Sequence, residues 1–552
     1  MINEMKNVFP KFTPYLQKYV YRSKLNQIGH QINRYPIVES SVQNQKILFG
    51  HSFSVFDPCF VHDRILAYAL RLRGIQILPV YCDQVQSAEC NVYGGVWGGE
   101  KFKENCNNCL NCSQELWRDN HFTPLKLSSY LRDDDRKKIN HQVSQLNEET
   151  WVDFTEDNLL FGLYAKDILV NNFVVGDYRL ITNHYSLGVS HIKNLLLLKV
   201  AYSRILGIYQ PDKVIANDSY YGMWAILERL CKKYQIPFYS HWLGGRENSW
   251  CYAQNDAAMN LDFSKPWATF SNLPLTEQQL TKVKNWLHGR SQGKEMILDV
   301  SSLSGFKTDE FDINKIDFDK PTALLASNVI WDLAALNKQV VFDDMIDWIV
   351  ETINWFKEHP QFQLIIKPHP AELHPSIPAT EETVEVALKQ RKIELSSNII
   401  LLSPKVKLTV YDLFPLIRAC LVHTTTVGIE VAAFGLPVIT TGKSPYRGFG
   451  FTLDPDTPCE YFKNIEMILS NQSLQKITKN QLDLVYKFIL FYHYHYYTKI
   501  NIMDYKWGEP PMLKIKSLAD ILPGKNKYLD YIIDSIIQGL PIISEDRWMP
   551  ES

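Results

Sequence analysis

The chain has 552 residues, of which 45% are hydrophobic and 21% charged, and its formal net charge is -2. This length exceeds what one hydrophobic core usually supports, so two or more domains are expected. The near-neutral charge excludes a general nucleic-acid binder, which carries a strong basic excess.

The sequence carries no signal for secretion or membrane insertion. Met1–Phe12 contains two lysines but no apolar segment of a signal peptide. The most apolar stretch, Leu195–Tyr209, is interrupted by Lys199 and Arg204, and it falls short of the roughly 20 residues that a membrane span needs. We therefore expect a cytoplasmic protein, with any membrane association peripheral and on the inner membrane face.

The first predicted elements alternate between strand and helix. Ile47-Leu48-Phe49 is an apolar run that predicts a buried strand, Phe60–Arg73 has helical spacing, and Ile75–Tyr81 predicts the next strand. Gly74 separates the helix from the second strand. This order indicates a βαβ unit and hence a parallel sheet.

Half of the ten cysteines lie in the segment 82–120, which is also rich in glycine and asparagine. We expect an irregular insertion here. Cys90, Cys106, Cys109 and Cys112 would supply four thiolates to a structural zinc ion or an iron–sulfur cluster. The alternative is a loop of reduced thiols without a metal.

A second strand–helix–strand unit follows a largely helical region, 128–209. Its strands are predicted at Asp212–Ala216 and Ile236–His241, with a helix at Met223–Tyr234 between them. The polar stretch from about residue 289 to 320 then has few apolar anchors, so we expect it to connect two domains.

The second half of the chain repeats the alternation of strands and helices. Strands are predicted at Thr322–Ala326, Phe362–Lys367, Asn398–Leu402, Cys420–Val422 and Pro437–Thr440, and helices at Asp343–Glu358, Val410–Arg418 and Val427–Phe434. The predicted fold is therefore α/β, with two Rossmann-like, doubly wound domains facing a cleft. We place the first domain at residues 1–300 and the second at 315–490.

The carboxy-terminal tail, residues 491–552, is expected to be ordered and to pack back on the first domain. Its beginning is strongly aromatic and includes His493 and His495, while Trp507 lies further along. A metal site at the two histidines and an aromatic patch at a membrane surface are alternatives. A helix packed on the core explains the pattern better.

A basic motif, Lys367-Pro368-His369-Pro370, follows a predicted apolar strand of the second domain. Ligands bind at the carboxyl ends of strands in open α/β sheets. Lys367 and His369 can both donate to phosphate oxygens, and His369 can also protonate a leaving phosphate. The alternative is a structural strand end with charges exposed to solvent.

A hydroxyl-rich motif, Thr424-Thr425-Thr426, precedes the predicted helix at Val427. We expect the three hydroxyls to cap this helix, whose N–H groups and positive dipole end suit a phosphate. Gly428 allows a close approach, and Glu430 lies within reach of a ribose bound there. The alternative is a capped helix with a surface glutamate.

These motifs are accompanied by Ser327-Asn328-Val329-Ile330-Trp331-Asp332, by Tyr411-Asp412-Leu413 and by the loop Gly442–Gly450. Over about Pro321–Gly450, the set resembles the donor half of bacterial capsule and lipopolysaccharide biosynthesis proteins, the group that includes the capsule Kdo transferases. The resemblance implies a glycosyltransferase of the GT-B type. It also implies that His369 holds the donor phosphate and that the threonines and Glu430 hold phosphate and ribose.

The resemblance further implies a nucleotide-sugar donor, with a CMP-sugar favoured over UDP- and GDP-sugars, and a glycan or glycolipid acceptor. It is also compatible with peripheral contact with a capsule assembly complex. Three alternatives remain: a polyol-phosphate transferase of the teichoic-acid type, a nucleotide-sugar epimerase and a non-catalytic assembly scaffold. The scaffold is disfavoured because the phosphate-binding residues are present.

A transferase also needs a base or a nucleophile near the anomeric carbon. Asp218 is the first candidate, because a carboxylate in a turn that follows a strand has both reach and flexibility. The other candidates are His51, Asp57, His62, Asp63, His241 and Glu247. A role as a cap or turn residue explains each of them equally well, and Asp57, directly before Pro58, is best explained as a turn residue.

Overall fold

The structure is a computed structural model that describes residues 13–35, 45–86, 90, 94–98, 101–119, 121–295, 308–332, 336–375, 377–506 and 508–551. Met1–Phe12, part of the expected connection (296–307) and Trp507 lie outside the described residues. The chain divides into two compact units. The first comprises Met1–Phe173, Tyr178–Leu261 and His493–Ser552, and the second comprises Val174–Asp177 and Asp262–Tyr492.

The second unit begins at Asp262, well ahead of residue 315. Two helices that the prediction placed in the first domain, α9 (Ser264–Phe270) and α10 (Glu277–Ser291), belong to the second unit. The aromatic ring of Trp267 on α9 packs against that of Phe488, with ring centroids 5.5 Å apart. The tail from His493 onward belongs to the first unit.

The first unit is built on a six-stranded sheet with the order β3-β2-β1-β4-β5-β6. All neighbouring strands pair in parallel except β5 and β6, which are antiparallel. The strands are β1 (Lys46–Phe49), β2 (Gln76–Tyr81), β3 (Leu125–Lys126), β4 (Lys213–Asn217), β5 (Phe238–Leu243) and β6 (Trp250–Gln254). The predicted parallel sheet is confirmed.

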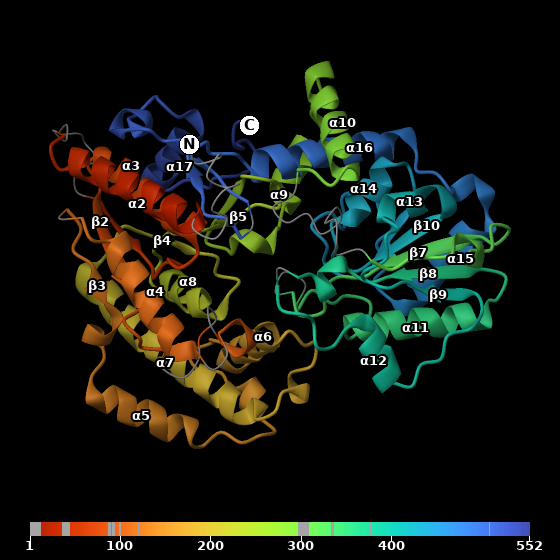
Figure 1. The fold of residues 1–552 in the computed structure, drawn as a ribbon, viewed down its shortest axis with the longest axis horizontal. Helices are drawn as coiled ribbons and strands as arrows, with labels where there is room; N and C mark the ends of the chain where they lie inside the picture. The colour runs from red at the N-terminus through yellow and green to blue at the C-terminus, as the bar shows by residue number, and fades with distance from the viewer. Residues whose placement is uncertain are drawn as a thin grey trace. The chain divides into compact units, whose positions relative to one another are not determined.

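Helices surround this sheet (Figure 1). They are α2 (Thr13–Ile32), α3 (Asp57–Leu72), α4 (Phe102–Leu116), α5 (Asp133–Val143), α6 (Phe161–Phe173), α7 (His184–Tyr209), α8 (Gly222–Lys233) and α17 (Lys527–Gln538). The tail also contributes an antiparallel pair, β12 (Met503–Asp504) and β13 (Met512–Leu513).

The prediction of an irregular cysteine-rich segment is wrong for its second half, which forms α4. Cys112, Ser113 and Leu116 are buried on one side of this helix. Their spacing of one and four residues marks a helical stripe, and cysteine packs as a small apolar side chain. The polar asparagines and glutamates between the cysteines concealed this stripe.

The second unit is built on a parallel sheet with the order β11-β10-β7-β8-β9. The strands are β7 (Thr322–Ala326), β8 (Gln363–Lys367), β9 (Ile399–Leu401), β10 (Ala419–Val422) and β11 (Val438–Thr440). Each lies within two residues of its predicted bounds. The prediction of an α/β fold with a second doubly wound sheet is confirmed.

Both faces of this second sheet are covered. Leu325 and Leu364 face a core formed with α11 (Met345–Glu358), α12 (Val384–Gln390) and α15 (Pro458–Ser470). Leu324 and Ile365 alternate with them along the strands and are also fully buried, so they face the opposite layer. The remaining helices are α13 (Val410–Leu413), α14 (Val427–Ala433) and α16 (Lys479–Leu490).

The aromatic segment predicted as a helix is helical, but it changes form along its length. After α16 the backbone continues as a π-helix, Phe491–Tyr496. His495 Nδ1 hydrogen-bonds the carbonyl oxygen of Met549 at 2.6 Å, and the carbonyl of His493 accepts from Arg246 at 2.7 Å. The two histidines thus contact other parts of the first unit.

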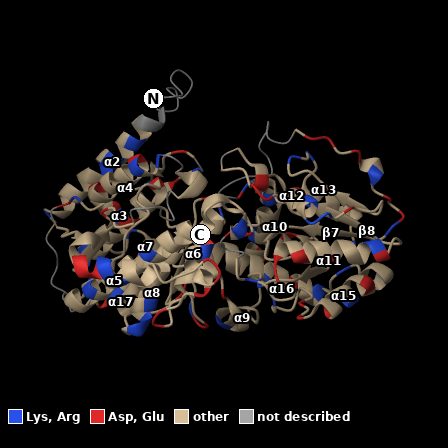
Figure 2. Ribbon diagram, turned by 90° about the horizontal axis from the view of Figure 1, so that it is seen from below, with Lys and Arg blue, Asp and Glu red and all other residues tan. Residues whose placement is uncertain are grey.

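Acidic and basic residues are interspersed on the helices of each unit (Figure 2), in keeping with the net charge of -2. Within the part of the chain that the structure describes, no helix combines the length and apolar character required to cross a membrane.

Candidate functional site

Each parallel sheet has a topological switch point, where consecutive connections leave in opposite directions along the sheet. In the second unit it lies between β7 and β10, and in the first unit between β1 and β4. Open α/β sheets bind ligands beyond the carboxyl ends of the strands at such points. The residues that follow these four strands are therefore the first places to look for a site.

In the second unit, the ends of the central strands are in register. Ala326, the last residue of β7, pairs with Lys367 on β8 and with Val422 on β10. The residues that follow each strand therefore emerge at one edge of the sheet. This brings together two of the predicted motifs, the Lys-Pro-His-Pro sequence and the His-Thr-Thr-Thr sequence, with the Ser-Asn pair between them.

An asparagine bridges the switch point of the second unit. Asn328 Oδ1 accepts a hydrogen bond from the backbone N–H of Thr424 at 3.0 Å. The neighbouring Ser327 is buried, and its Oγ has no hydrogen-bond partner among the described residues. A buried hydroxyl without a partner is uncommon in a folded protein. An unused donor at a switch point is suited to binding a ligand.

His369 lies two residues beyond the end of β8 and caps η8 (Pro370–Leu373). Its Nδ1 accepts a hydrogen bond from the backbone N–H of Ala371 at 3.1 Å. Burial, followed by the positive charge of Lys367, lowers the pKa of His369 to about 4. The imidazole is therefore neutral at pH 7, and because Nδ1 accepts, Nε2 carries the hydrogen. His369 can donate one hydrogen bond to an anion without bringing a positive charge.

The prediction that three threonine hydroxyls cap α14 is wrong. Thr426 occupies the N-cap position with helical dihedral angles, and its side chain makes no capping bond. The space beside Gly428 is also taken, because a Cβ there would lie 2.2 Å from the hydroxyl oxygen of Tyr446. That hydroxyl donates to the carbonyl oxygen of Thr425 at 2.6 Å. Gly428 thus allows a close approach of Tyr446, from the predicted loop Gly442–Gly450.

Glu430 is buried and already paired within the second unit. Its Oε1 accepts two hydrogen bonds from the Arg290 guanidinium, at 2.7 and 3.1 Å, and its Oε2 accepts one from the Tyr411 hydroxyl. The side chain of Glu430 is 3% exposed. The alternative of a surface glutamate is therefore excluded, and a ribose would have to share the carboxylate with Arg290.

The switch point of the first unit is also bridged by an asparagine side chain. Asn217, the last residue of β4, accepts a hydrogen bond through Oδ1 from the backbone N–H of Phe53, in the loop after β1, at 2.8 Å. In both units, an asparagine side chain therefore ties together the two loops that flank the switch point.

Asp218 follows Asn217 and is completely buried. Its Oδ1 accepts hydrogen bonds from the backbone N–H groups of Tyr220 at 3.2 Å and Met259 at 3.4 Å. Its Oδ2 has no hydrogen-bond partner among the described residues. Burial raises the pKa of Asp218 to about 7, so the carboxyl group titrates near neutral pH. This is the range that suits a general base.

We expect Asp218→Asn to be more stable than wild type at pH 8 by about 1–3 kcal/mol, and to lose this advantage below about pH 4. Because the folded pKa of Asp218 is raised, the folded state retains a proton that the unfolded state releases. The carboxyl group therefore costs stability as the pH rises from about 4 to about 7. Urea unfolding at several pH values tests this, and an advantage that does not depend on pH would contradict it.

Three other candidates of the first unit form one buried group. His62 Nδ1 lies 2.9 Å from Asp63 Oδ1, and His241 Nε2 lies 3.0 Å from the same oxygen. Tyr252 contributes its hydroxyl, 2.6 Å from His62 Nε2. Among the described residues, this is the one group of three side chains whose ligand atoms are close enough to hold a metal ion. His241 lies inside β5, which continues two residues beyond the predicted end of that strand.

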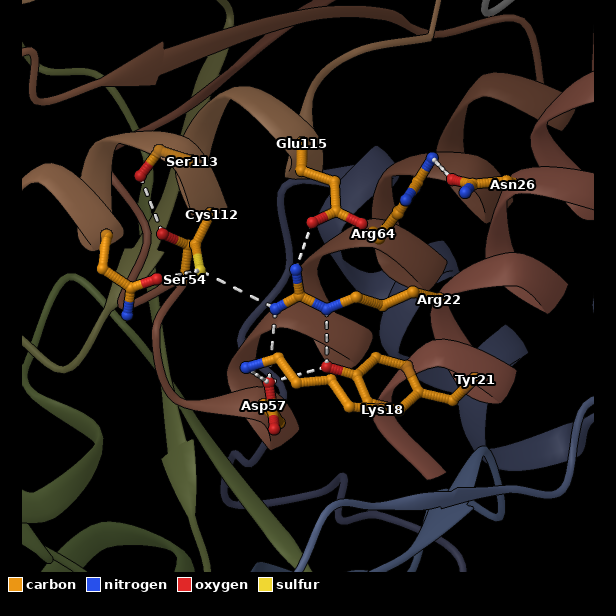
Figure 3. Close-up of polar contacts among 11 residues, drawn as sticks. Lys18, Tyr21, Arg22, Asn26, Ser54, Asp57, Arg64, Cys112, Ser113 and Glu115 are labelled. Atoms are coloured by element: carbon orange, nitrogen blue, oxygen red, sulfur yellow. Dashed lines mark hydrogen bonds and ion pairs between the residues drawn. The ribbon is translucent and has the colours of Figure 1, made fainter. Parts of the chain in front are cut away.

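The other candidates of the first unit are separate from this group. His51 Nδ1 contacts the Tyr202 hydroxyl at 2.5 Å, and burial lowers the pKa of His51 to about 3. Asp57 begins α3 and forms ion pairs with two residues of α2, Lys18 at 3.1 Å and Arg22 at 3.4 Å (Figure 3). Asp57 thus joins two helices. Glu247 lies in the loop between β5 and β6.

The structure also contains an aromatic cluster near the carboxyl edge of the first sheet, which was not predicted from the sequence. The rings of Phe53 and Trp242 are parallel within 1°, with centroids 6.0 Å apart, and Tyr221 lies 5.1 Å from Trp242. All three rings are half-buried. Aromatic residues near strand ends, visible in the sequence, would have indicated this cluster. Such surfaces line many small-molecule sites.

No protein-family model and no curated protein sequence matches this chain. Solved structures similar to it include a beta Kdo 2,4 transferase, KpsC, from Thermosulfurimonas dismutans (TM-score 0.35, 14% identity, covering 59% of this chain and 87% of that one). A UDP-GlcNAc 2-epimerase from Neisseria meningitidis, bound to UDP-GlcNAc, has a TM-score of 0.23 and 10% identity, covering 81% and 98%. The strand orders of the two sheets, and not these similarities, establish the α/β class.

Proposed function

We propose that this protein is a glycosyltransferase that uses a nucleotide-activated sugar, with the nucleotide bound at the switch point of the second unit. The observation that supports this most strongly is the convergence of three motifs at one sheet edge. Ser327 and Asn328, the His369 imidazole and the backbone of Thr424 follow three adjacent strands in register. The Ser327 hydroxyl and the Nε2–H of His369 offer neutral donors at this edge, whereas the Thr424 N–H is bonded to Asn328 and holds the two loops together. Such donors suit a phosphate ester.

The sequence motifs of the second unit also favour one class of donor. Because they resemble the donor half of capsule and lipopolysaccharide transferases, a CMP-sugar is the favoured donor, and UDP- and GDP-sugars are the competing classes. We propose that the first unit binds the acceptor, a surface glycan or glycolipid. Its half-buried aromatic cluster, with Phe53 and Trp242 in parallel, provides apolar faces beside the switch point.

Asp218 is our candidate for the general base. Its pKa of about 7 suits removal of a proton from an acceptor hydroxyl at neutral pH. Because the carboxyl group is buried, this role requires the acceptor to reach the turn Asp218–Tyr221. An activity profile that follows a group titrating near pH 7, and that is abolished in Asp218→Asn, would support the assignment.

Calorimetric titration of CMP, CDP, UDP and GDP tests the donor site. One nucleotide is expected to bind wild type, and His369→Ala is expected to weaken that binding by about 10- to 100-fold, because one hydrogen bond to a charged phosphate is lost. His288→Ala, which alters an exposed histidine on α10, is the matched control. Binding that both variants retain would show that the nucleotide lies elsewhere.

A further inference from the structure

Three buried side chains of the first unit bring metal-ligating atoms together. His62 and Asp63 lie in the second turn of α3, and His241 lies in β5. Asp63 Oδ1 is 2.9 Å from His62 Nδ1 and 3.0 Å from His241 Nε2, and the ligand atoms of all three residues lie within 4.8 Å of one another. Ligand atoms on one tetrahedral zinc ion lie roughly 3.4 Å apart. The group is therefore close to the spacing that such an ion requires.

His241 is the member of this group whose polar contacts are least complete. Its side chain is 1% exposed, and neither ring nitrogen makes a well-aligned hydrogen bond with a described residue. Its Nε2 nevertheless lies beside Asp63 Oδ1. Buried polar atoms in folded proteins nearly always have a partner. A ring nitrogen and a carboxylate oxygen that lie side by side without a well-aligned hydrogen bond indicate a position for a cation bound to both.

Further groups hold the ligands in place. Tyr252 on β6 places its hydroxyl 2.6 Å from His62 Nε2, and Trp250 stacks on the His62 ring, with centroids 4.0 Å apart. Ser52 donates from Oγ to Asp63 Oδ2. Metal-binding histidines and carboxylates usually have such outer partners, which orient the side chain and fix the tautomer. Because Tyr252 can accept the Nε2–H of His62, the Nδ1 lone pair is left for an ion.

The four cysteines predicted as metal ligands are arranged differently. Among the described residues, no three of them form a group as close as that of the two histidines and the aspartate. The sulfur of Cys112 accepts from Arg22 Nη2 at 3.7 Å (Figure 3), and its thiol donates to Asn108 Oδ1 at 3.9 Å. Cys112 thus joins α4 to α2, and a metal at the cysteines stays a prediction.

The ligand types select the kind of ion. Imidazole nitrogens bind zinc and related divalent transition metals, whereas magnesium and calcium prefer oxygen ligands alone. Zinc sites with three protein ligands commonly combine two histidines with one carboxylate and leave the fourth position to a water molecule. Two histidines and one aspartate match this set.

We propose that His62, Asp63 and His241 bind a divalent transition-metal ion, with zinc as the best match. The ion would join α3, which carries two of the ligands, to β5, which carries the third. Through Ser52 it would also fix the loop after β1, beside the switch point of the first unit. In the metal-free protein, His62 Nδ1 and Asp63 Oδ1 share a hydrogen bond instead. The site does not depend on the proposed transferase activity.

Calorimetric titration of zinc into untagged, chelator-treated full-length protein tests this site. Wild type is expected to bind one equivalent more than Asp63→Asn and His241→Gln, with a Kd of about 1 μM or lower. Tyr252→Phe removes only an outer partner and should weaken the binding of this equivalent by about 10- to 100-fold. His51→Gln, which alters another buried histidine of the first unit, is the matched control and should retain it. Circular dichroism of each variant establishes that it is folded.

Cobalt gives a second measurement that needs no variant. Co²⁺ bound to imidazole and carboxylate ligands absorbs weakly in the visible range, whereas thiolate ligands add an intense band in the near ultraviolet. We expect the visible bands of nitrogen and oxygen ligands. Wild type that binds no zinc, or no more of it than folded Asp63→Asn and His241→Gln, would overturn the proposal. Cobalt bound through thiolates alone would also overturn it, because the metal would then lie at the cysteines.

Discussion

Glu430→Ala is expected to lower the free energy of unfolding of the second unit by about 3–5 kcal/mol, because it leaves the buried Arg290 guanidinium without its partner. The two side chains are 3% and 11% exposed, and they share two hydrogen bonds. Tyr411 also loses the acceptor of its hydroxyl. Urea unfolding followed by tryptophan fluorescence measures the loss.

A double-mutant cycle separates this structural role from a role in binding ribose. Glu430→Ala combined with Arg290→Met removes the unpaired charge, and it is expected to recover a large part of the lost stability. If Glu430 also binds the ribose, the double variant will be folded but will bind the nucleotide more weakly. Equal stability of Glu430→Ala and wild type would contradict the buried ion pair.

Asp63→Ala is expected to destabilise the first unit by about 3–5 kcal/mol at pH 7, because it leaves an orphaned polar group on each of its neighbours. His62, His241 and Ser52 all direct a polar atom at the Asp63 carboxylate. The two histidines, by hydrogen bonding and charge, hold the pKa of Asp63 well below its usual range despite burial. Asp63 therefore contributes stability at neutral pH that is lost only in strong acid.

His62 adds a pH dependence of its own. Burial lowers the pKa of His62 to about 4, so the unfolded chain takes up a proton near pH 6.5 that the folded chain does not. The first unit should therefore lose stability as the pH falls from about 6.5 to about 4. His62→Gln should weaken this dependence, whereas His288→Ala should leave it unchanged. A stability that is constant over this range would contradict a neutral buried His62.

The strands were predictable because a buried parallel strand is a short apolar run between turn residues. Leu364-Ile365-Ile366 and Ile47-Leu48-Phe49 show this pattern, and both form strands. The convergence of the Lys-Pro-His-Pro and His-Thr-Thr-Thr motifs was also foreseeable, because the carboxyl ends of parallel strands share one edge. For these strands and motifs, the local sequence pattern and the topology of the parallel sheet lead to the same prediction.

The partners of the site residues could not be predicted, because they come from distant parts of the chain. The residues near Glu430 in the sequence give no indication that Arg290, 140 residues away, is its partner. The three-residue spacing of Cys106, Cys109 and Cys112 suggests one ligand set, but successive positions rotate around the helix. Cys112 therefore faces α2.

The most direct test of the proposed function is the fate of the nucleotide when the protein is incubated with CMP-, UDP- and GDP-sugars and analysed by mass spectrometry. We expect the protein to release the free nucleotide from one class of donor. The rate of release should be low without an acceptor, and it should be strongly reduced in His369→Ala. Recovery of an isomerised sugar still attached to its nucleotide would instead identify an epimerase. The absence of both turnover and binding with every donor, in folded protein, would contradict the account.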